Sequence, residues 1–502
     1  MMVQTYLWIG IALFVAMLLV LGYVGYKKTK TFDDYVIGGF SLGPYSLGLA
    51  LAATFFSAAT FMGYVGWSYD MGYSNLWRIF ALGILCPLGA VIVAKKVRDI
   101  TGKVKAVSLP DWCGSRFDSD VLRVMVAILV LFNIAYIAAQ ISAGAWVFEV
   151  MLGIPYRTGV VAVAVVVLLY VTMGGTFSDI YTDAVQAVLM AVCGLLVFFS
   201  IYFIMDGSIL GVQNEIATNL QQQDANLTRV INPESSMYYS VAAIVFMLFA
   251  DFWAVGQPQI INKIMALEKK RDMGKLLVTY VVATFCFLLV VWGGFYARAL
   301  IPEVIAHPDT ALPEYVSWAM HPLLAAFVGV VILAASLSTT DGLFVVISTA
   351  ISNDIFKRVL VPRGIMGKNL KTEEEVDRFC TKIARVTTVL IGVLALIAAW
   401  EQPAYLGDLV LFGIMGTVSG VIGMVVYGSF SPKATPGAAI ASLIIGVSVF
   451  LYTYLFTGIT SVPHAGGIAY LTSIVTIILF SQFTKQTISD QHLDQFFVKK
   501  QM

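Results

Sequence analysis

Charged residues are scarce in this chain: Asp, Glu, Lys and Arg together make up 12% of its 502 residues. A water-soluble domain carries about twice that share, so the composition excludes an ordinary soluble protein. The net charge is only +1, which gives no electrostatic basis for binding a nucleic acid.

Cysteine and histidine are also rare. The five cysteines and four histidines are scattered, and no Cys-x-x-Cys or Cys/His spacing occurs among them. The sequence therefore indicates neither a disulfide framework nor a metal site of the Cys/His type. A Walker-type phosphate loop is absent too, which argues against an ATP-driven pump. The sequence also shows no combination of a nucleophile with a base that would indicate an enzyme.

Long apolar runs are what the chain has in excess, with 59% hydrophobic residues. A membrane span needs about 20 of them in succession. The sequence predicts an all-α polytopic membrane protein with thirteen spans, at 5–26, 43–69, 75–95, 124–150, 157–174, 181–206, 237–262, 275–301, 316–350, 383–400, 405–428, 436–457 and 466–483. The ninth is longer than one span requires, so we expect it to include a cytoplasmic extension.

The positions of the basic residues predict how the chain is oriented. With the N-terminus outside, 27 of the 31 Lys and Arg residues fall on the inner side. The other four, Arg78, Arg157, Arg229 and Arg298, fall outside or near outer helix ends. Cytoplasmic loops carry the excess of positive charge, so the N-terminus is predicted outside and the C-terminus inside.

Two polar interruptions fit this orientation. Residues 207–235 are predicted to form an outer solvated loop that can hold a short helix. Residues 353–382 are predicted inside, and their KTEEEVDRF segment is typical of a charged, amphipathic start to the next helix.

Residues 43–66, GPYSLGLALAATFFSAATFMGYVG, differ from a simple membrane anchor. Thr54, Ser57 and Thr60 lie in the middle of this span among alanines. Small residues let helix backbones approach, and hydroxyls can replace lost backbone partners. We therefore expect the helix to break near Ala53–Ser57, with freed carbonyls and hydroxyls facing a small polar cavity at mid-membrane.

The span 237–262 contains a second candidate break. Gly256 and Pro258 interrupt it, beside Trp253 and Gln257. Proline removes a backbone donor and frees a carbonyl one turn earlier. The alternative is a simple kink, which membrane helices tolerate.

Four segments carry a resemblance to a known family. They are KTFDDYVIGGFSLGP at 30–44, YVTMGGTFSDIYTDAVQ at 170–186, FWAVGQPQIINKIMA at 252–266 and ILAASLSTTDGLFVVISTAISNDIF at 332–356. In the same order and spacing, over essentially the whole chain, they resemble the sodium/solute symporter family. The helix sequences are most similar to those of the pantothenate and proline branches of the family.

The resemblance implies a leucine-transporter-like core of two inverted five-helix repeats. In this chain they form part of a single transmembrane domain, 1–502. Its expected parts are a leading helix and loop (1–40), the first repeat (41–206), the second repeat (236–428), two trailing helices (429–484) and a cytoplasmic tail (485–502).

The resemblance also implies a sodium site. The family pairs two carbonyls of the first broken helix with one carbonyl and two hydroxyls of a later span. Matched residue by residue, these are the carbonyls of Ala53, Phe56 and Ala335 and the hydroxyls of Ser338 and Thr339. The spacing of three and four puts the last three on one helix face. The alternative is that both hydroxyls bond back to carbonyls one turn earlier. No metal besides sodium is expected.

Two acidic residues are candidates for handling the ion near this site. The resemblance places Asp183 on the route by which sodium leaves to the cytoplasm. The alternative is a carboxylate at the start of span six, stabilised by the helix dipole. Asp341 follows Thr339 and can coordinate a cation or take a proton, which leaves proton coupling as an alternative.

The substrate is expected beside the ion, between the two broken helices. The candidates are Thr54, Ser57 and Thr60 on the first, Asp251, Trp253 and Gln257 on the second, and Gln140 in span four, where Asn133 and Tyr136 share its helical spacing. For Trp253 and Tyr136 the alternative is plain packing.

Asp251 is the unusual residue of this set. An acid inside an apolar span costs several kcal/mol unless paired, so it is expected to hold an amine, a proton or a second cation. The alternative is that it lies wet near the outer mouth. No basic residue is expected deep in any span, so an anionic substrate would rely on helix N-termini, hydroxyls and sodium.

Together these features predict sodium-coupled uptake of a small polar organic solute by alternating access. Pantothenate or another small carboxylate is the first candidate, and proline or another amino acid is the alternative. A channel is less favoured, because no repeated filter motif occurs. The expected location is the cell membrane, as in a bacterial plasma membrane, and the expected partners are the solute, sodium and lipid.

Overall fold

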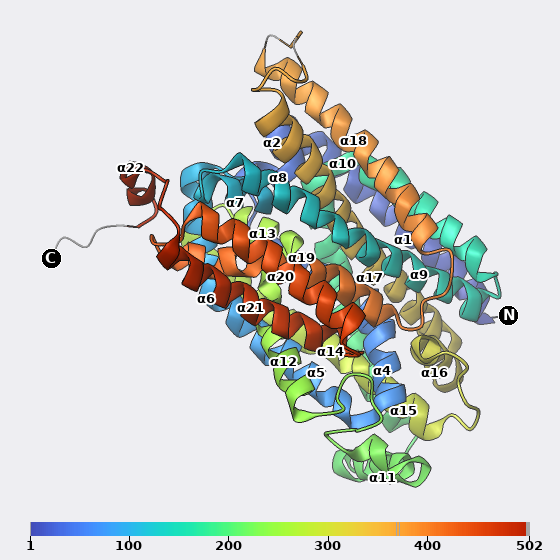
Figure 1. Ribbon diagram of the computed structural model, residues 1–502. Helices are drawn as coiled ribbons and strands as arrows, with labels where there is room; N and C mark the ends of the chain where they lie inside the picture. The colour runs from blue at the N-terminus through green and yellow to red at the C-terminus, as the bar shows by residue number, and fades with distance from the viewer. Residues whose placement is uncertain (1, 368, 371, 498–502) are drawn as a thin grey trace.

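The computed structural model describes residues 2–367, 369–370 and 372–497, without the side chains of 170–174. Apart from one isolated bridge between Leu42 and Leu267, the regular structure of these residues is helical (Figure 1). The predicted all-α class is therefore confirmed.

The first half of the chain forms eleven α-helices: α1 (Met2–Lys28), α2 (Phe32–Ile37), α3 (Pro44–Phe55), α4 (Tyr64–Met71), α5 (Leu76–Phe80), α6 (Cys86–Val104), α7 (Leu109–Arg116), α8 (Asp120–Leu129), α9 (Asn133–Leu152), α10 (Tyr156–Ser200) and α11 (Ile209–Gln223).

The described residues of the second half form eleven more: α12 (Val241–Phe252), α13 (Pro258–Met265), α14 (Met273–Leu288), α15 (Trp292–Leu300), α16 (Ala311–Ala319), α17 (Pro322–Thr349), α18 (Glu373–Ala398), α19 (Leu406–Phe430), α20 (Pro436–Phe456), α21 (Val462–Phe483) and α22 (Asp490–Asp494).

The first predicted break is present. Helix α3 ends at Phe55, Phe56 has non-helical angles (φ −95°, ψ 84°), and a π-helical turn, Ala59–Gly63, leads into α4. Gln140 of α9 stabilises the gap: its Oε1 accepts from the Ala58 N–H at 3.1 Å, and its Nε2 donates to Ser57 Oγ at 3.3 Å. One amide thus partners polar groups that a continuous helix would have satisfied itself.

The second break is also present and is more than a kink. Helix α12 ends at Phe252, a short 3₁₀ turn covers Ala254–Gly256, and Gln257 is extended (φ −63°, ψ 134°). Pro258 then starts α13, where its missing N–H has no helical role to lose. Both broken helices therefore occur in the two spans that the sequence singled out.

Other span boundaries differ from prediction. The fifth and sixth predicted spans form one helix, α10, with a sharp bend at Gly175 (φ 57°, ψ −157°). A side chain on that glycine would meet the Tyr35 carbonyl at 2.7 Å, so only glycine suits the bend. The ninth span begins later, at Pro322, because α16 is a separate short helix, and it extends as a π-helix over Ala350–Leu360.

The two polar interruptions contain the helices that were predicted in them. The loop after α10 contains the fifteen-residue helix α11, and α18 begins at Glu373, capped by Thr372 and Glu375. In Figure 1, α11 lies at one end of the molecule, whereas α2 and the start of α18 lie at the opposite end.

Ten helical stretches of the described chain are long and apolar enough to cross a membrane. Three shorter apolar helices, Pro44–Phe55, Tyr156–Leu169 and Val241–Phe252, overlap predicted spans two, five and seven. The count of thirteen, the orientation of the termini and the repeat boundaries stay predictions.

The packing brings distant segments together around the first break. Helix α10 packs against both α3 and α17, and α13 contacts α3 and α17. Helix α17 is one of the two most enclosed spans, with 83% of its apolar window buried. These four helices surround the candidate site.

Candidate functional site

The first broken helix meets α17 through two hydroxyl groups. Ser338 Oγ lies 3.2 Å from the carbonyl oxygen of Ala53, and Thr339 Oγ1 lies 3.2 Å from that of Thr54. Each hydroxyl also lies close to the Ala335 carbonyl of its own helix, at 3.1 Å and 3.4 Å. Each hydroxyl can therefore donate either to the Ala335 carbonyl of its own helix or to a carbonyl of α3.

This arrangement is a small, dry cluster of oxygen atoms. Ala53, Phe56, Ala335, Ser338 and Thr339 are all fully buried. The non-helical angles of Phe56 turn its carbonyl out of the regular helical ladder. Hard alkali cations prefer such neutral oxygens, so the donor set fits sodium. The carbonyl of Thr54, which the sequence analysis did not name, adjoins the same cluster.

The neighbouring Thr340 shows what a hydroxyl does outside this cluster. Its Oγ1 donates to the Ser336 carbonyl, one turn earlier, at 2.6 Å. Thr340 is as deeply buried as Thr339 but lies on another face of α17. The two threonines therefore form a matched pair for testing the site.

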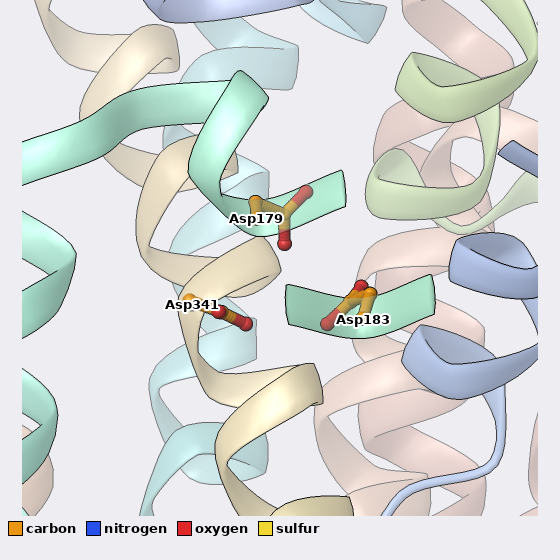
Figure 2. A group of neighbouring side chains, drawn as sticks. All are labelled: Asp179, Asp183 and Asp341. Atoms are coloured by element: carbon orange, nitrogen blue, oxygen red, sulfur yellow. The ribbon is translucent and has the colours of Figure 1, made fainter. Parts of the chain in front are cut away.

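A buried group of charges adjoins the oxygen cluster. Asp179 and Asp183 of α10 and Asp341 of α17 have carboxylate oxygens within 4.8 Å of one another. Figure 2 shows the three side chains directed toward a common space between the two helices. Lys263 of α13 enters this space, with Nζ 3.1 Å from Asp179 and 2.5 Å from Asp183.

Thr54 joins the charged group to the oxygen cluster. Its side chain donates to Asp183 Oδ2 at 2.8 Å and accepts from the Lys263 ammonium, while its carbonyl faces Thr339. Thr54, predicted to contact substrate, therefore lies at the boundary between the oxygen cluster and the acidic residues.

The expectation that no basic residue lies deep in a span was wrong, because Lys263 is buried with a side-chain exposure of 6%. The predicted span ended one residue before Lys263, whereas α13 continues to Met265. A lysine at the end of a span usually extends toward the interface. Only the positions of Asp179 and Asp183 show that this one turns inward.

Asp183 does not lie at a helix N-terminus. The bend in α10 is at Gly175, so Asp183 follows it by about two helical turns. Its carboxylate is stabilised by Lys263 and Thr54 rather than by the ends of a helix. The helix-dipole alternative is therefore excluded.

The remaining substrate candidates of the first broken helix lie at its break. Ser57 and Thr60 are buried, and the Ser57 carbonyl accepts from the Thr60 N–H at 2.8 Å. Gln140 and Ser57 contact each other, and Tyr136 neighbours both Ser57 and Thr339. The structure thus brings span four to the first break, as the helical spacing predicted.

At the second break, Gln257 accepts a hydrogen bond from Gln259 at 2.7 Å. Trp253 packs edge-on against Phe249 and Phe252, which fits the packing alternative. Its indole Nε1 is nevertheless buried without a hydrogen-bond partner among the described residues.

Asp251 is neither wet nor unpaired. Its exposure is 1%, and both carboxylate oxygens lie 2.9 Å from Arg78 Nη1. The wet-mouth alternative is therefore wrong. Arg78, which the sequence placed outside or near an outer helix end, is buried as well, with a side-chain exposure of 2%. The two residues are 173 positions apart, so the sequence held no local signal of their pairing.

Comparison with known proteins identifies the family. The model of the sodium:solute symporter family matches residues 35–446. The high-affinity proline transporter of Bacillus subtilis is 24% identical over 95% of this chain and 98% of its own length. The sodium/proline symporter of Escherichia coli is 26% identical over 89% of this chain and 87% of its own.

Solved structures show the same fold. A Na⁺-coupled sialic acid symporter in a substrate-bound, outward-open state has a TM-score of 0.78, with 20% identity over 97% of this chain and 98% of its own. A nucleobase-cation-symport-1 family transporter has a TM-score of 0.56, with 14% identity over 91% and 96%. The likeness confirms a leucine-transporter-like architecture. Since the family model covers most of the chain, this multi-pass membrane protein belongs to the sodium:solute symporter family, whose members are secondary transporters and not enzymes.

Proposed function

We propose that this protein takes up a small polar organic solute together with sodium, by alternating access. The observation that supports it most directly is the contact between the Ser338 and Thr339 hydroxyls and the carbonyls of Ala53 and Thr54. Two segments 285 residues apart meet at a helix break, where their oxygen atoms are shielded from water.

In the proposal the coupling ion is held by the carbonyls of Ala53, Phe56 and Ala335 and the hydroxyls of Ser338 and Thr339. A cation there joins α3 to α17 and favours the conformation in which both contact it. A solute that binds the same conformation is then bound more tightly in the presence of sodium, and the effect is reciprocal. The linkage couples the solute to the sodium gradient.

Asp183 is proposed to lie on the exit route of the ion. Thr54 connects the oxygen cluster directly to Asp183 and Lys263. A small cavity reaches this region between α2, α10, α13 and α17, and it is lined by residues including Asp179, Asn262 and Lys263. An ion that leaves the oxygen cluster on this side meets carboxylates before it meets water.

The solute is proposed to bind between the two breaks, where Ser57, Thr60, Gln140, Trp253 and Gln257 are candidates. Pantothenate or another small carboxylate and proline or another amino acid are the two substrate classes that the sequence favours. The similarity to proline transporters supports the second class. Proton coupling is the ionic alternative, and a bacterial plasma membrane is the proposed location.

Thr339→Val tests the coupling site, with Thr340→Val as its matched control. Valine keeps the shape of threonine but removes the oxygen atom. We expect the sodium concentration for half-maximal uptake into proteoliposomes to rise at least about tenfold in Thr339→Val and to stay unchanged in Thr340→Val. Uptake must saturate and must accumulate solute against its gradient, since a channel would do neither.

Unchanged sodium dependence in Thr339→Val would remove the assigned ion site. Accumulation driven by a proton gradient without sodium would favour the ionic alternative instead. A panel of amino acids and small carboxylates, with and without sodium, identifies the solute class.

A further inference from the structure

The buried ion pair between Arg78 and Asp251 has no role in the coupling site. Arg78 Nη1 donates to both oxygens of Asp251 at 2.9 Å, and both side chains are 2% exposed. Removing two charges from water is expensive, and apolar residues of similar volume often stabilise a fold as well or better. A pair of this kind therefore needs a reason other than stability.

The position of the pair suggests that reason. Asp251 lies in the last turn of α12, directly before the second break. Arg78 of α5 lies over the rings of Tyr64 and Trp67, 5.0 Å and 5.8 Å from their centroids. Both rings belong to α4, which continues the first broken helix beyond its break. The pair thus lies between the second half of the first discontinuous helix, α4, and the first half of the second, α12.

Polar atoms around the pair are incompletely satisfied. Among the residues that the structure describes, Arg78 Nε, Trp67 Nε1 and Asp408 Oδ1 are buried without a hydrogen-bond partner. Asp408 of α19 interacts electrostatically with Arg78. An unpaired buried donor or acceptor costs about 1–3 kcal/mol, so several near one ion pair are unfavourable for a purely structural role. A ligand with polar groups of both kinds would satisfy them.

We propose that Arg78 and Asp251 together recognise the zwitterion of an amino acid. The carboxylate of the solute binds the Arg78 guanidinium, and its ammonium or secondary ammonium binds the Asp251 carboxylate. The stacked rings of Tyr64 and Trp67, 5.1 Å apart, lie beside the guanidinium and restrict the size of the solute. This inference rests on the proposed solute transport and names its substrate class.

Charge balance explains the selectivity. The pair is neutral overall. A zwitterion adds a negative charge beside the Arg78 guanidinium and a positive charge beside the Asp251 carboxylate, so the sum stays neutral. A small carboxylate without an amine would place a second anion beside Asp251 in a buried site, and like charges there cost several kcal/mol. The empty pair is neutral as well, because each residue then neutralises the other.

The test uses the full-length protein in detergent, with ligand binding measured as a rise in unfolding temperature in the presence of sodium. The probes are L-proline and other neutral L-amino acids, pantothenate, which has a carboxylate and no amine, and L-prolinamide, which has an amine and no carboxylate. We expect at least one amino acid to stabilise the wild-type protein and both single-charge probes to have no effect.

Arg78→Met/Asp251→Leu is the informative variant, because it removes one buried charge of each sign and leaves neither partner of the pair alone. We expect it to lose at least about 100-fold in amino-acid affinity and to keep the stabilisation by sodium. Arg78→Lys/Asp251→Glu retains both charges and replaces the first variant in the test if that one does not fold. It should bind the same amino acid more weakly than wild type and still not bind pantothenate. Tyr238→Phe, which removes a nearby hydroxyl bonded to Asn75, is the control and should behave as wild type.

Wild-type affinity in Arg78→Met/Asp251→Leu, or stabilisation by pantothenate without stabilisation by any amino acid, would overturn the zwitterion site. Failure of the proposed function has a different signature: sodium then neither stabilises the wild-type protein nor drives uptake of any solute.

Discussion

Lys263 is a single residue with three carboxylate neighbours. Its ammonium contacts Asp179 and Asp183, and Asp341 lies in the same group. With all four groups ionised, three negative charges face one positive charge, which leaves an excess of two. Such an excess is unfavourable in a buried site, so a cation in the adjoining oxygen cluster offsets part of it. Lys263 thus lowers the attraction that the carboxylates exert on that cation.

Lys263→Gln should therefore bind sodium more tightly and release it more slowly. We expect the sodium concentration for half-maximal uptake to fall and the maximal rate to fall at least about tenfold, measured in proteoliposomes. Lys275→Gln is the control, since Lys275 pairs with Asp272 at the surface, where an ion pair contributes little. A normal maximal rate in Lys263→Gln would show that the ammonium has no part in ion release.

Asp309 provides a prediction about pH. It lies in the loop before α16, where burial raises the pKa of its carboxyl from 3.8 to about 7. Its Oδ2 accepts from the Leu406 N–H at 2.7 Å, and Asp408 adds a repulsive charge. The adjacent His307 gives no compensating positive charge near neutrality, because burial lowers its pKa.

Because the pKa of Asp309 is higher in the folded protein than in the unfolded chain, the folded protein binds the proton more tightly. The free energy of unfolding should therefore fall as the pH rises from about 4 to about 7 and then level off. Asp309→Asn keeps the shape without the ionisation, so its unfolding temperature should fall less than that of wild type between about pH 5 and about pH 8. Parallel curves for both proteins would exclude Asp309 as the source of any pH dependence.

At the scale of helices, close packing depends on residues without side chains. Gly194 near the C-terminal end of α10 is an example: a Cβ atom there would lie 2.0 Å from the carbonyl oxygen of Cys286 in α14. Apolar side chains gain little by packing against each other in lipid, so membrane helices associate through such close approaches.

Gly194→Ala is expected to push α10 and α14 apart and to destabilise the fold by about 1–3 kcal/mol. The matched variant is Gly22→Ala in α1, where no atom lies within 4 Å of the added Cβ. We expect a lower unfolding temperature and a lower yield of monodisperse protein only for Gly194→Ala. Equal behaviour of the two variants would mean that the helices adjust without cost.

At the scale of the whole molecule, the orientation predicted from basic residues is open to a direct test. Helix α11 lies at the end of the molecule opposite to α2 and the start of α18 (Figure 1). Gln222 of α11 and Lys433, between α19 and α20, are both exposed. With the N-terminus outside, Gln222 faces the exterior and Lys433 the cytoplasm.

Cysteine labelling of intact cells measures this orientation. We expect Gln222→Cys to react with an impermeant maleimide from outside and Lys433→Cys to react only after the cells are opened. The native cysteines should contribute little background, because four are buried and Cys286 is half-buried. Labelling of Lys433→Cys in intact cells would reverse the predicted orientation.

Much of this architecture is encoded locally and was predictable. Apolar runs predict helices because a backbone in lipid has to satisfy its own hydrogen bonds. Gly256, Pro258 and the small residues around Ser57 mark the two places where the helical hydrogen bonding is interrupted. Ser338 and Thr339 share a helix face because of helical periodicity alone. The resemblance to the family then indicated that the two hydroxyls face carbonyl groups of the first broken helix.

Local sequence is enough to specify the helical class, the two breaks and the face of α17 that carries hydroxyls. The inward turn of Lys263 to Asp183, the pairing of Arg78 with Asp251 and the single bent helix α10 follow from tertiary packing. These outcomes depend on which helices become neighbours, and partners more than 70 residues apart leave no periodic signal in either segment. A charged side chain near the end of a span can extend toward water or toward a buried partner, and the packing of the surrounding helices decides between the two.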